Sequence, residues 1–302
     1  MLALGWWLIP ITLFHLVPLC FDSQSWRELF PASNRPSRPS FVWMRWIRES
    51  VSTLLPVAGV GGDVVGARLA HQRGVPGAQA TASMVVDITV GTATQLVFVI
   101  AGVALLASRK SHDAAAVASG VAIGVAVFAA AIAVFVRLQH SSMFGVLVGW
   151  AHRLAPKSWM SSFAVRAEAI DDAVVANYRR RSALSRSGAL RLGGWVTGVG
   201  ETWLTMWALG HPLSLTNAFI LESLSAGVRG AAFMVPGALG AQEGGLVLFG
   251  ALIGIPADLA LAVALAKRVR ELALGLPGLA AWQWVEGRRL LARPTDKASS
   301  TS

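Results

Sequence analysis

The stretch LLPVAGVGGD at residues 54–63 decides the fold, because its pattern returns later in the chain. The second copy lies in FMVPGALGAQEGG at residues 233–245, where Pro236 stands 180 residues after Pro56. Hydrophobic segments that Pro and Gly interrupt at corresponding places in two halves indicate a transporter-like binding site. The same offset aligns Asp63 with Glu243, Gly74-Val75-Pro76 with Gly254-Ile255-Pro256, Ala80 with Ala260 and Ala82 with Ala262.

Composition outside these copies indicates a membrane protein. Of the 302 residues 54% are hydrophobic and 14% are charged, whereas a soluble domain has roughly 25% charged residues. The runs at residues 88–108 and 114–136 contain no charged residue. Each has about the 20 apolar residues that a helix needs to cross a bilayer. We therefore expect an integral membrane protein rather than a soluble enzyme.

The segments predict an all-α polytopic protein with about five full spans and two re-entrant helical hairpins that Pro and Gly break. Residues 1–302 form one membrane domain, with repeat one at about 3–107, a connecting span and an amphipathic cytoplasmic segment at 114–188, repeat two at about 189–286 and a polar tail at 287–302. We expect spans at about 3–21, 77–107, 114–136, 189–209 and 257–284, a polar loop at 22–45, and hairpins at about 46–73 and 214–254. In the connecting segment, apolar residues at helical spacing predict a helix at the membrane surface: Phe163, Ala167, Ile170, Val174 and Tyr178, opposite Arg166, Glu168, Asp171 and Asp172.

Basic residues predict the orientation. Loop 22–48, segment 137–191 and the C-terminal tail hold 18 of the 26 Lys and Arg residues, and all three fall on one side of the predicted topology. Cytoplasmic loops carry such an excess, so we expect the N-terminus outside and the C-terminus in the cytoplasm, in a cell inner membrane. An odd number of crossings separates the two copies, so the repeats should be inverted.

Ionisable residues within the apolar segments are candidates for a substrate pathway, since charges in a membrane are costly and usually face a partner or a polar cavity. The alternative is that they form ion pairs that only hold helices together. Backbone groups freed at the Pro and Gly breaks need a polar cavity as well, unless the breaks are plain packed kinks. The candidates for binding or pathway are Pro56, Gly61, Asp63, Arg68, Asp87, Glu201, Glu222, Arg229, Pro236, Gly240, Glu243, Lys267, Arg268, Arg270 and Glu271.

Spacing within these candidates predicts particular contacts. Lys267 and Arg268 lie four and three residues before Glu271, so that carboxylate can neutralise either cation. Asp63 and Glu243 are expected to be symmetry mates that reach one central cavity from opposite sides.

Other classes find little support. The basic residues lie between apolar spans and form no patch for nucleic acid. His-Glu-x-x-His, Gly-x-Ser-x-Gly and Walker motifs do not occur, and the six His residues and single Cys show no metal-ligand spacing. We expect no cofactor, no metal and no catalytic residue, and we consider enzymatic activity the less favoured interpretation.

The two signature stretches also resemble a known family. Leu54-Leu55-Pro56-Val57 followed by Val60-Gly61-Gly62-Asp63, and residues 233–245, are similar to the flippase-like membrane region of lysylphosphatidylglycerol synthases. The similarity extends over nearly the whole chain and is closest to the hopanoid-associated branch. It includes Glu201, Glu222, Arg229, Lys267-Arg268-Val269-Arg270-Glu271, Leu276-Pro277-Gly278-Leu279 and Trp282. The synthases carry a soluble aminoacyl-transferase domain that this sequence does not contain, and relatives tend to have one more helix before residues 3–21.

The resemblance implies a membrane lipid translocator or lipid-handling protein associated with hopanoid biosynthesis or transport. Its partners would be a hopanoid or another lipid with a polar headgroup, and hopanoid biosynthetic proteins. Two alternatives remain open from the residues: a membrane-embedded enzyme or accessory subunit that modifies a hopanoid headgroup, and a scaffold for the biosynthetic complex.

Overall fold

The computed structural model describes residues 4–55, 60–108, 157–232 and 238–291, together with 120, 126, 129–130, 133–134, 136–139 and 235. Within these residues all regular secondary structure is helical. In chain order the helices are η1 (Gly5–Trp7), α1 (Leu8–Phe14), α2 (Leu16–Glu28), η2 (Ala32–Asn34), α3 (Arg38–Leu54), α4 (Val60–His71), α5 (Gly77–Ala107), α8 (Lys157–Arg179), α9 (Arg181–Ala208), α10 (Leu215–Ala231), α11 (Ala241–Leu252) and α12 (Ala257–Leu291). The all-α prediction is confirmed.

Two described segments are long and apolar enough to cross a membrane, Gly5–Glu28 and Gly77–Ala107. Helices α9 and α12 have 28 and 35 residues. They are long enough to span but less apolar, because each carries charged side chains near its middle. The predicted span at 114–136 lies mostly outside the described residues, as do Pro56 and Pro236.

The N-terminal region differs from the prediction. The first helical segment breaks at His15 and then continues as α2 to Glu28, and α3 already begins at Arg38. The polar loop expected at 22–45 is therefore wrong, and the first hairpin starts eight residues earlier than predicted. The polar residue Asp22 continues the helix because its carboxylate binds Arg45 and Arg191 inside the bundle.

Other predicted boundaries also move. Helix α9 begins at Arg181 rather than near residue 189, and α12 continues to Leu291, past the start of the tail expected at 287. The side chain of Glu286 near that end accepts a hydrogen bond from Arg68 at 2.6 Å. A pairing partner thus explains why charged residues prolong α12.

The two hairpins are built alike. Helices α3 and α10 each have 17 residues, and α4 and α11 each have 12. Both second helices end in the same C-cap, with Gly74 at φ +89° and Gly254 at φ +79°. In each cap the next residue donates to the carbonyl five positions back, Val75 N–H to Ala70 at 3.3 Å and Ile255 N–H to Gly250 at 2.9 Å. These bonds define a Schellman motif, which Gly permits because it lacks a Cβ.

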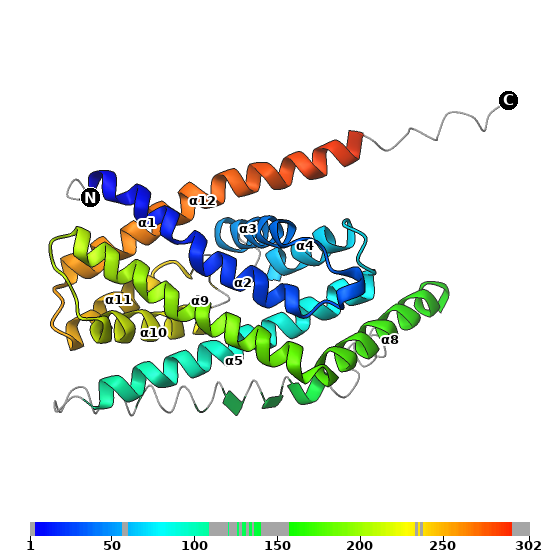
Figure 1. Cartoon of the computed structure of the whole chain (residues 1–302), viewed down its shortest axis with the longest axis horizontal. Coiled ribbons are helices and arrows are strands. Elements are labelled where there is room, and N and C mark those ends of the chain that lie inside the picture. The colour runs from blue at the N-terminus through cyan, green and yellow to red at the C-terminus, as the bar shows by residue number, and fades with distance from the viewer. Residues whose placement is uncertain are drawn as a thin grey trace.

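The hairpins are exchanged between the halves. Helix α3 packs against α12 of the second half, and α10 packs against α5 of the first half. Figure 1 shows α3 and α4 extending inward from one end of the bundle, and α10 and α11 extending inward from the other. The two hairpins thus enter the bundle from opposite ends, which is the arrangement that an inverted repeat predicts.

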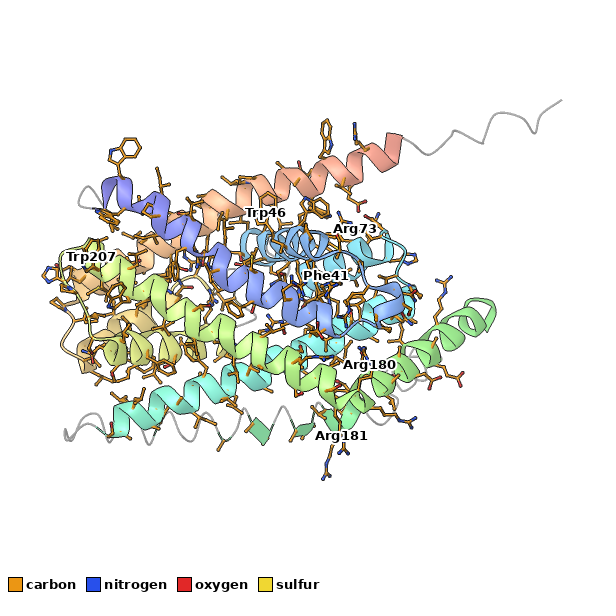
Figure 2. The ribbon with its side chains drawn as sticks, in the orientation of Figure 1. Phe41, Trp46, Arg73, Arg180, Arg181 and Trp207 are labelled. Atoms are coloured by element: carbon orange, nitrogen blue, oxygen red, sulfur yellow. The ribbon has the colours of Figure 1, made fainter. Side chains whose placement is uncertain are left out.

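An aromatic cluster holds the first hairpin to α2. Trp26, Phe30 and Phe41 are fully buried, with edge-on ring contacts at centroid distances of 5.0–5.5 Å. Figure 2 shows Phe41 within the bundle and Arg181 projecting from its outside, at the start of α9. Such aromatic pairs add about 0.5–1.5 kcal/mol each beyond their buried area.

Helix α8 is amphipathic, as its spacing predicts. Ala167 and Val174 are buried, and the helix packs against α5. Asp171 is the exception, since the pattern puts it on the polar face but the structure buries it. Whether α8 lies at a membrane surface stays a prediction.

Candidate functional site

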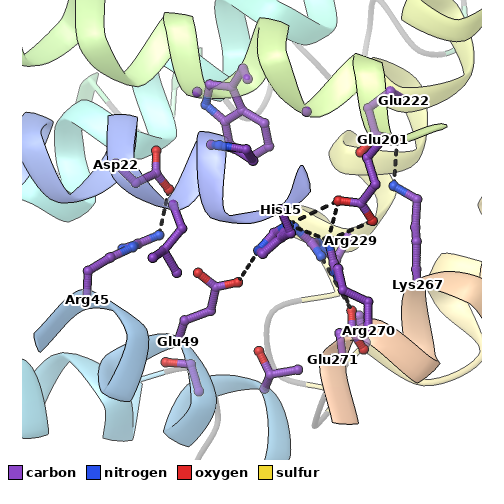
Figure 3. Close-up of a pocket in the computed structure, with 18 of the residues that line it drawn as sticks. His15, Asp22, Arg45, Glu49, Glu201, Glu222, Arg229, Lys267, Arg270 and Glu271 are labelled. Carbon is purple, nitrogen blue, oxygen red and sulfur yellow. Dashed lines mark hydrogen bonds and ion pairs between the residues drawn. The ribbon is translucent and has the colours of Figure 1, made fainter. Parts of the chain in front are cut away.

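A polar cavity of about 310 Å³ lies where α2, α3, α9, α10 and α12 meet. Figure 3 shows charged side chains reaching into it from all five helices. Five acidic and five basic residues line it together with His15: Asp22, Glu49, Glu201, Glu222 and Glu271, and Arg45, Arg191, Arg229, Lys267 and Arg270. A cavity of this composition inside an apolar chain is where a polar ligand can be held.

His15 stands at the break between α1 and α2. Pro18 follows three residues later, and proline has no N–H to continue the helix and crowds the carbonyl four residues before it. The break leaves the imidazole between two carboxylates, with Nδ1 3.0 Å from Glu201 Oε2 and Nε2 2.8 Å from Glu49 Oε1. Nη1 of Arg270 also lies 2.7 Å from Nδ1.

Helix α12 supplies the cations of this half. Arg270 donates to both carboxylate oxygens of Glu201, at 2.9 and 2.7 Å. Arg268 binds Glu271 at 2.7 Å, so the three-residue pairing predicted from the sequence is present. Lys267 does not pair with Glu271, however, but donates to Glu222 of α10 at 2.6 Å. Of the two cations that Glu271 could neutralise, it binds Arg268, and Lys267 binds the carboxylate that α10 brings to its side of α12.

A second group of charges continues from the cavity toward α5. Asp22 accepts from Arg45 at 2.7 Å and from Arg191 at 3.0 Å. Arg191 and Arg48 both bind the fully buried Asp87. Removing one partner of a buried pair costs about 3–5 kcal/mol, so these pairs fix the relative positions of α2, α3, α5 and α9.

Six residues that the sequence proposes line the cavity: Glu201, Glu222, Arg229, Lys267, Arg270 and Glu271. Two others lie one ion pair away, since Asp87 binds Arg191 and Arg268 binds Glu271. Arg68 is mostly exposed and pairs with Glu286. Gly61 lies in the first turn of α4, and Gly240 is the residue before α11 with φ +78°.

Asp63 and Glu243 occupy equivalent places but do not line this cavity. Each lies in the first turn of the second hairpin helix, and each binds an arginine: Asp63 binds Arg48 at 2.7 Å, and Glu243 binds Arg268 at 2.9 Å. Glu243 also accepts the N–H of Gly240 at 2.8 Å. The two acids thus secure the hairpin turns, and the side chains nearer the cavity come from other positions.

Five ionisable residues of the cavity are not among the binding or pathway candidates: His15, Asp22, Arg45, Glu49 and Arg191. His15 could have been found, because it is the single ionisable residue in the apolar run at residues 2–21. Arg45, Arg48 and Arg191 fall in segments that the sequence predicts on the cytoplasmic side, but all three belong to the internal network. The count on that face therefore falls from 18 to 15.

Three N–H groups in the cavity wall have no partner in the described residues. They are Nε of Arg45, Nε of Arg191 and Nε1 of Trp195. A buried donor without an acceptor costs about 1–3 kcal/mol. An oxygen acceptor from a ligand or from water would offset this cost at each group. In the described part of the chain no three His, Cys, Asp or Glu side chains are arranged to hold a metal ion.

An apolar groove of about 610 Å³ adjoins the cavity. Leu19 lines both spaces, and Trp46 and Leu274 separate them through a hydrogen bond from the indole Nε1 to the Leu274 carbonyl at 2.8 Å. A small pocket between the two is lined by these three residues together with His15, Glu49 and Arg270. The polar cavity and the apolar groove are thus neighbours, and Trp46 and Leu274 form the wall between them.

Comparison with known proteins supports a family assignment. No curated protein and no solved structure matches the chain significantly. Residues 2–278 match the family model described as the lysylphosphatidylglycerol synthase TM region. This match covers both hairpins and every charged residue that lines the cavity. The chain therefore belongs to the lysylphosphatidylglycerol synthase transmembrane-region family.

Proposed function

We propose that the protein moves or presents a membrane lipid, with the polar headgroup in the charged cavity and the apolar part in the adjoining groove. The observation that carries the proposal is that Leu19 lines both spaces and that a small pocket shares lining residues with each of them. A lipid has the same division into polar and apolar parts, whereas a soluble solute needs no groove. Membership of a lipid-related membrane family supports the same conclusion.

The unpartnered donors indicate what the headgroup offers. Nε of Arg45, Nε of Arg191 and Nε1 of Trp195 supply N–H groups and accept nothing. Arg229 adds a cation that is 45% exposed and lies 3.8 Å from its nearest carboxylate, on Glu271. The headgroup should therefore present several oxygen acceptors. A hopanoid polyol meets this requirement, and we propose that the lipid is a hopanoid.

The experiment measures lipid movement between leaflets in vesicles that contain the purified protein and a fluorescent lipid. Trp195→Phe removes one unpartnered donor but keeps the ring that stacks on Phe98 at 5.6 Å. Trp282→Phe is the matched control, because its Nε1 is also unpartnered but lies outside the cavity. We expect about tenfold slower movement for Trp195→Phe, from the loss of about one hydrogen bond, and no change for Trp282→Phe.

The result also separates the alternatives. If a folded wild-type protein moves no lipid and the recovered headgroups are chemically altered, the cavity belongs to an enzyme. If neither occurs and only contacts with biosynthetic proteins depend on the protein, it is a scaffold. We further propose an inner-membrane location with a cytoplasmic C-terminus, which labelling of a cysteine placed in the tail from each side of the membrane would test.

A further inference from the structure

The ion pairs in and around the cavity form three groups of directly contacting side chains. Within the described residues, Lys267 and Glu222 form one neutral pair. Three acids balance three arginines in the second group: Asp22, Asp63 and Asp87 with Arg45, Arg48 and Arg191. The third group holds four carboxylates and three guanidinium groups around His15: Glu49, Glu201, Glu243 and Glu271 with Arg229, Arg268 and Arg270.

The third group is therefore one positive charge short. A buried charge without a counter-charge is costly, so the group needs one further cation. His15 is placed to provide it, because it lies between two of the four carboxylates and its proton would make the group neutral. Glu49 depends on it most, since its direct ion-pair partner within the described residues is His15.

The hydrogen bonds of the ring allow two states that exclude each other. In the neutral state Nε2–H donates to Glu49 and the lone pair of Nδ1 accepts from Arg270. In the protonated state Nδ1 holds a proton taken from water in the cavity and donates it to Glu201. Arg270 then keeps its two bonds to Glu201, which are already formed. In both states each ring nitrogen has a hydrogen-bond partner, so the ring can bind and release the proton.

We infer that His15 is a proton-binding site and that its proton is the ion to which lipid movement is coupled. The second statement rests on the proposed function, whereas the first does not. The charged groups that face the ring are Glu49 from α3, Glu201 from α9, and Arg270 with Glu271 from α12. Helix α5 contributes only Asp87, which Arg48 and Arg191 already bind.

The position of His15 gives the proton an effect on the cavity. The ring stands at the break between α1 and α2 and connects α3, α9 and α12 through its partners. Loss of the proton removes the bond to Glu201 and leaves Glu49 without its direct ion-pair partner. The contacts between the first hairpin and the second half then weaken together, next to the wall that separates cavity from groove.

The first experiment measures thermal unfolding of the purified protein between about pH 5 and pH 9, the range in which an imidazole titrates. The protonated group is neutral, so the melting temperature of the wild type should fall as the pH rises. His15→Gln keeps a hydrogen-bond donor but cannot be charged, and should lose this part of the pH dependence. Glu49→Gln removes the excess negative charge and should lose it as well, with the fold retained.

His71→Gln is the control, because His71 bonds the Val75 carbonyl at 2.9 Å, outside the network. It should behave as the wild type. A wild-type pH dependence in His15→Gln would falsify the proton site. So would a Glu49→Gln variant that keeps the dependence while remaining folded.

The second experiment imposes a pH difference across vesicles that contain the protein. The rate of lipid movement in the wild type and in His71→Gln should depend on the gradient, and in Glu49→Gln it should not. Wild-type movement that ignores the gradient overturns the coupling and leaves lipid handling in place. No movement in any gradient overturns the coupling together with the proposed function, and the unfolding curves still decide whether His15 binds the proton.

Discussion

His15 and Glu201 are 186 positions apart in the chain, yet Nδ1 of the first lies 3.0 Å from Oε2 of the second. The contact joins the break between α1 and α2 to the middle of α9. Arg270 of α12 binds the same carboxylate, so three helices from both halves of the protein meet at Glu201. The polar cavity is built around this meeting point.

Replacing Glu201 should therefore destabilise the protein strongly. Glu201→Gln leaves Arg270 without its main counter-charge in the interior, at an expected cost of about 3–5 kcal/mol in the free energy of unfolding. Denaturant or thermal unfolding in detergent measures this. Glu168→Gln on the exposed face of α8 is the control and should change stability little. Equal stability of the two variants would contradict the buried network.

The pair between Lys267 and Glu222 offers a test by restoration. Lys267→Met and Glu222→Leu should each lose about 3–5 kcal/mol, because each leaves one buried charge alone. The double variant should recover most of that loss, since both charges are gone. Recovery of stability without recovery of lipid movement would assign the pair to the pathway, whereas recovery of both would make it structural only.

Close helix crossings should not tolerate a methyl group. A Cβ on Gly102 of α5 would lie 2.9 Å from Cβ of Ser223 in α10, and a Cβ on Gly278 of α12 would lie 2.8 Å from Cβ of Ser50 in α3. Gly102→Ala and Gly278→Ala should each cost about 1–3 kcal/mol through overpacking. Gly287→Ala has open space and should be neutral or stabilising by unfolding measurements.

The two C-caps should respond alike to substitution. Gly74 and Gly254 both have positive φ, where a Cβ costs about 1–2 kcal/mol. Gly74→Ala and Gly254→Ala should lower the melting temperature by similar amounts, because the repeat uses the same cap twice. Gly244→Ala serves as the helical control, with nothing within 4 Å of its added Cβ. Clearly unequal effects would show that one cap is held by other contacts.

The wall between cavity and groove can be loosened without adding bulk. Trp46→Phe keeps an aromatic ring but removes the indole N–H that binds the Leu274 carbonyl at 2.8 Å. If a headgroup passes this wall, lipid movement in vesicles should become faster, with stability reduced by only about 1 kcal/mol. Slower movement at unchanged stability would instead make this bond part of the lipid-binding surface.

The amino-acid sequence by itself determined the class and the repeat. Uncharged runs predict membrane-spanning helices, because the thickness of the bilayer sets the length that such a run must have. Pro and Gly predict helix breaks, because their effect on the backbone is local, and in the structure α3 ends at Leu54 and α10 ends at Ala231. The charged residues of α12 were recognised for the same reason, since a cluster within an apolar segment is visible without any partner.

Only the tertiary structure decided which charges meet. Arg191 binds Asp87 across 104 positions, and Arg270 approaches His15 across 255. No spacing along the chain contains such pairs, because they arise where helices far apart in the chain cross and each hairpin packs on the long helix of the other half. Because of the same helix packing, Lys267 binds Glu222 of α10 rather than Glu271 of its own helix. The packing also places His15 in the group that lacks one positive charge.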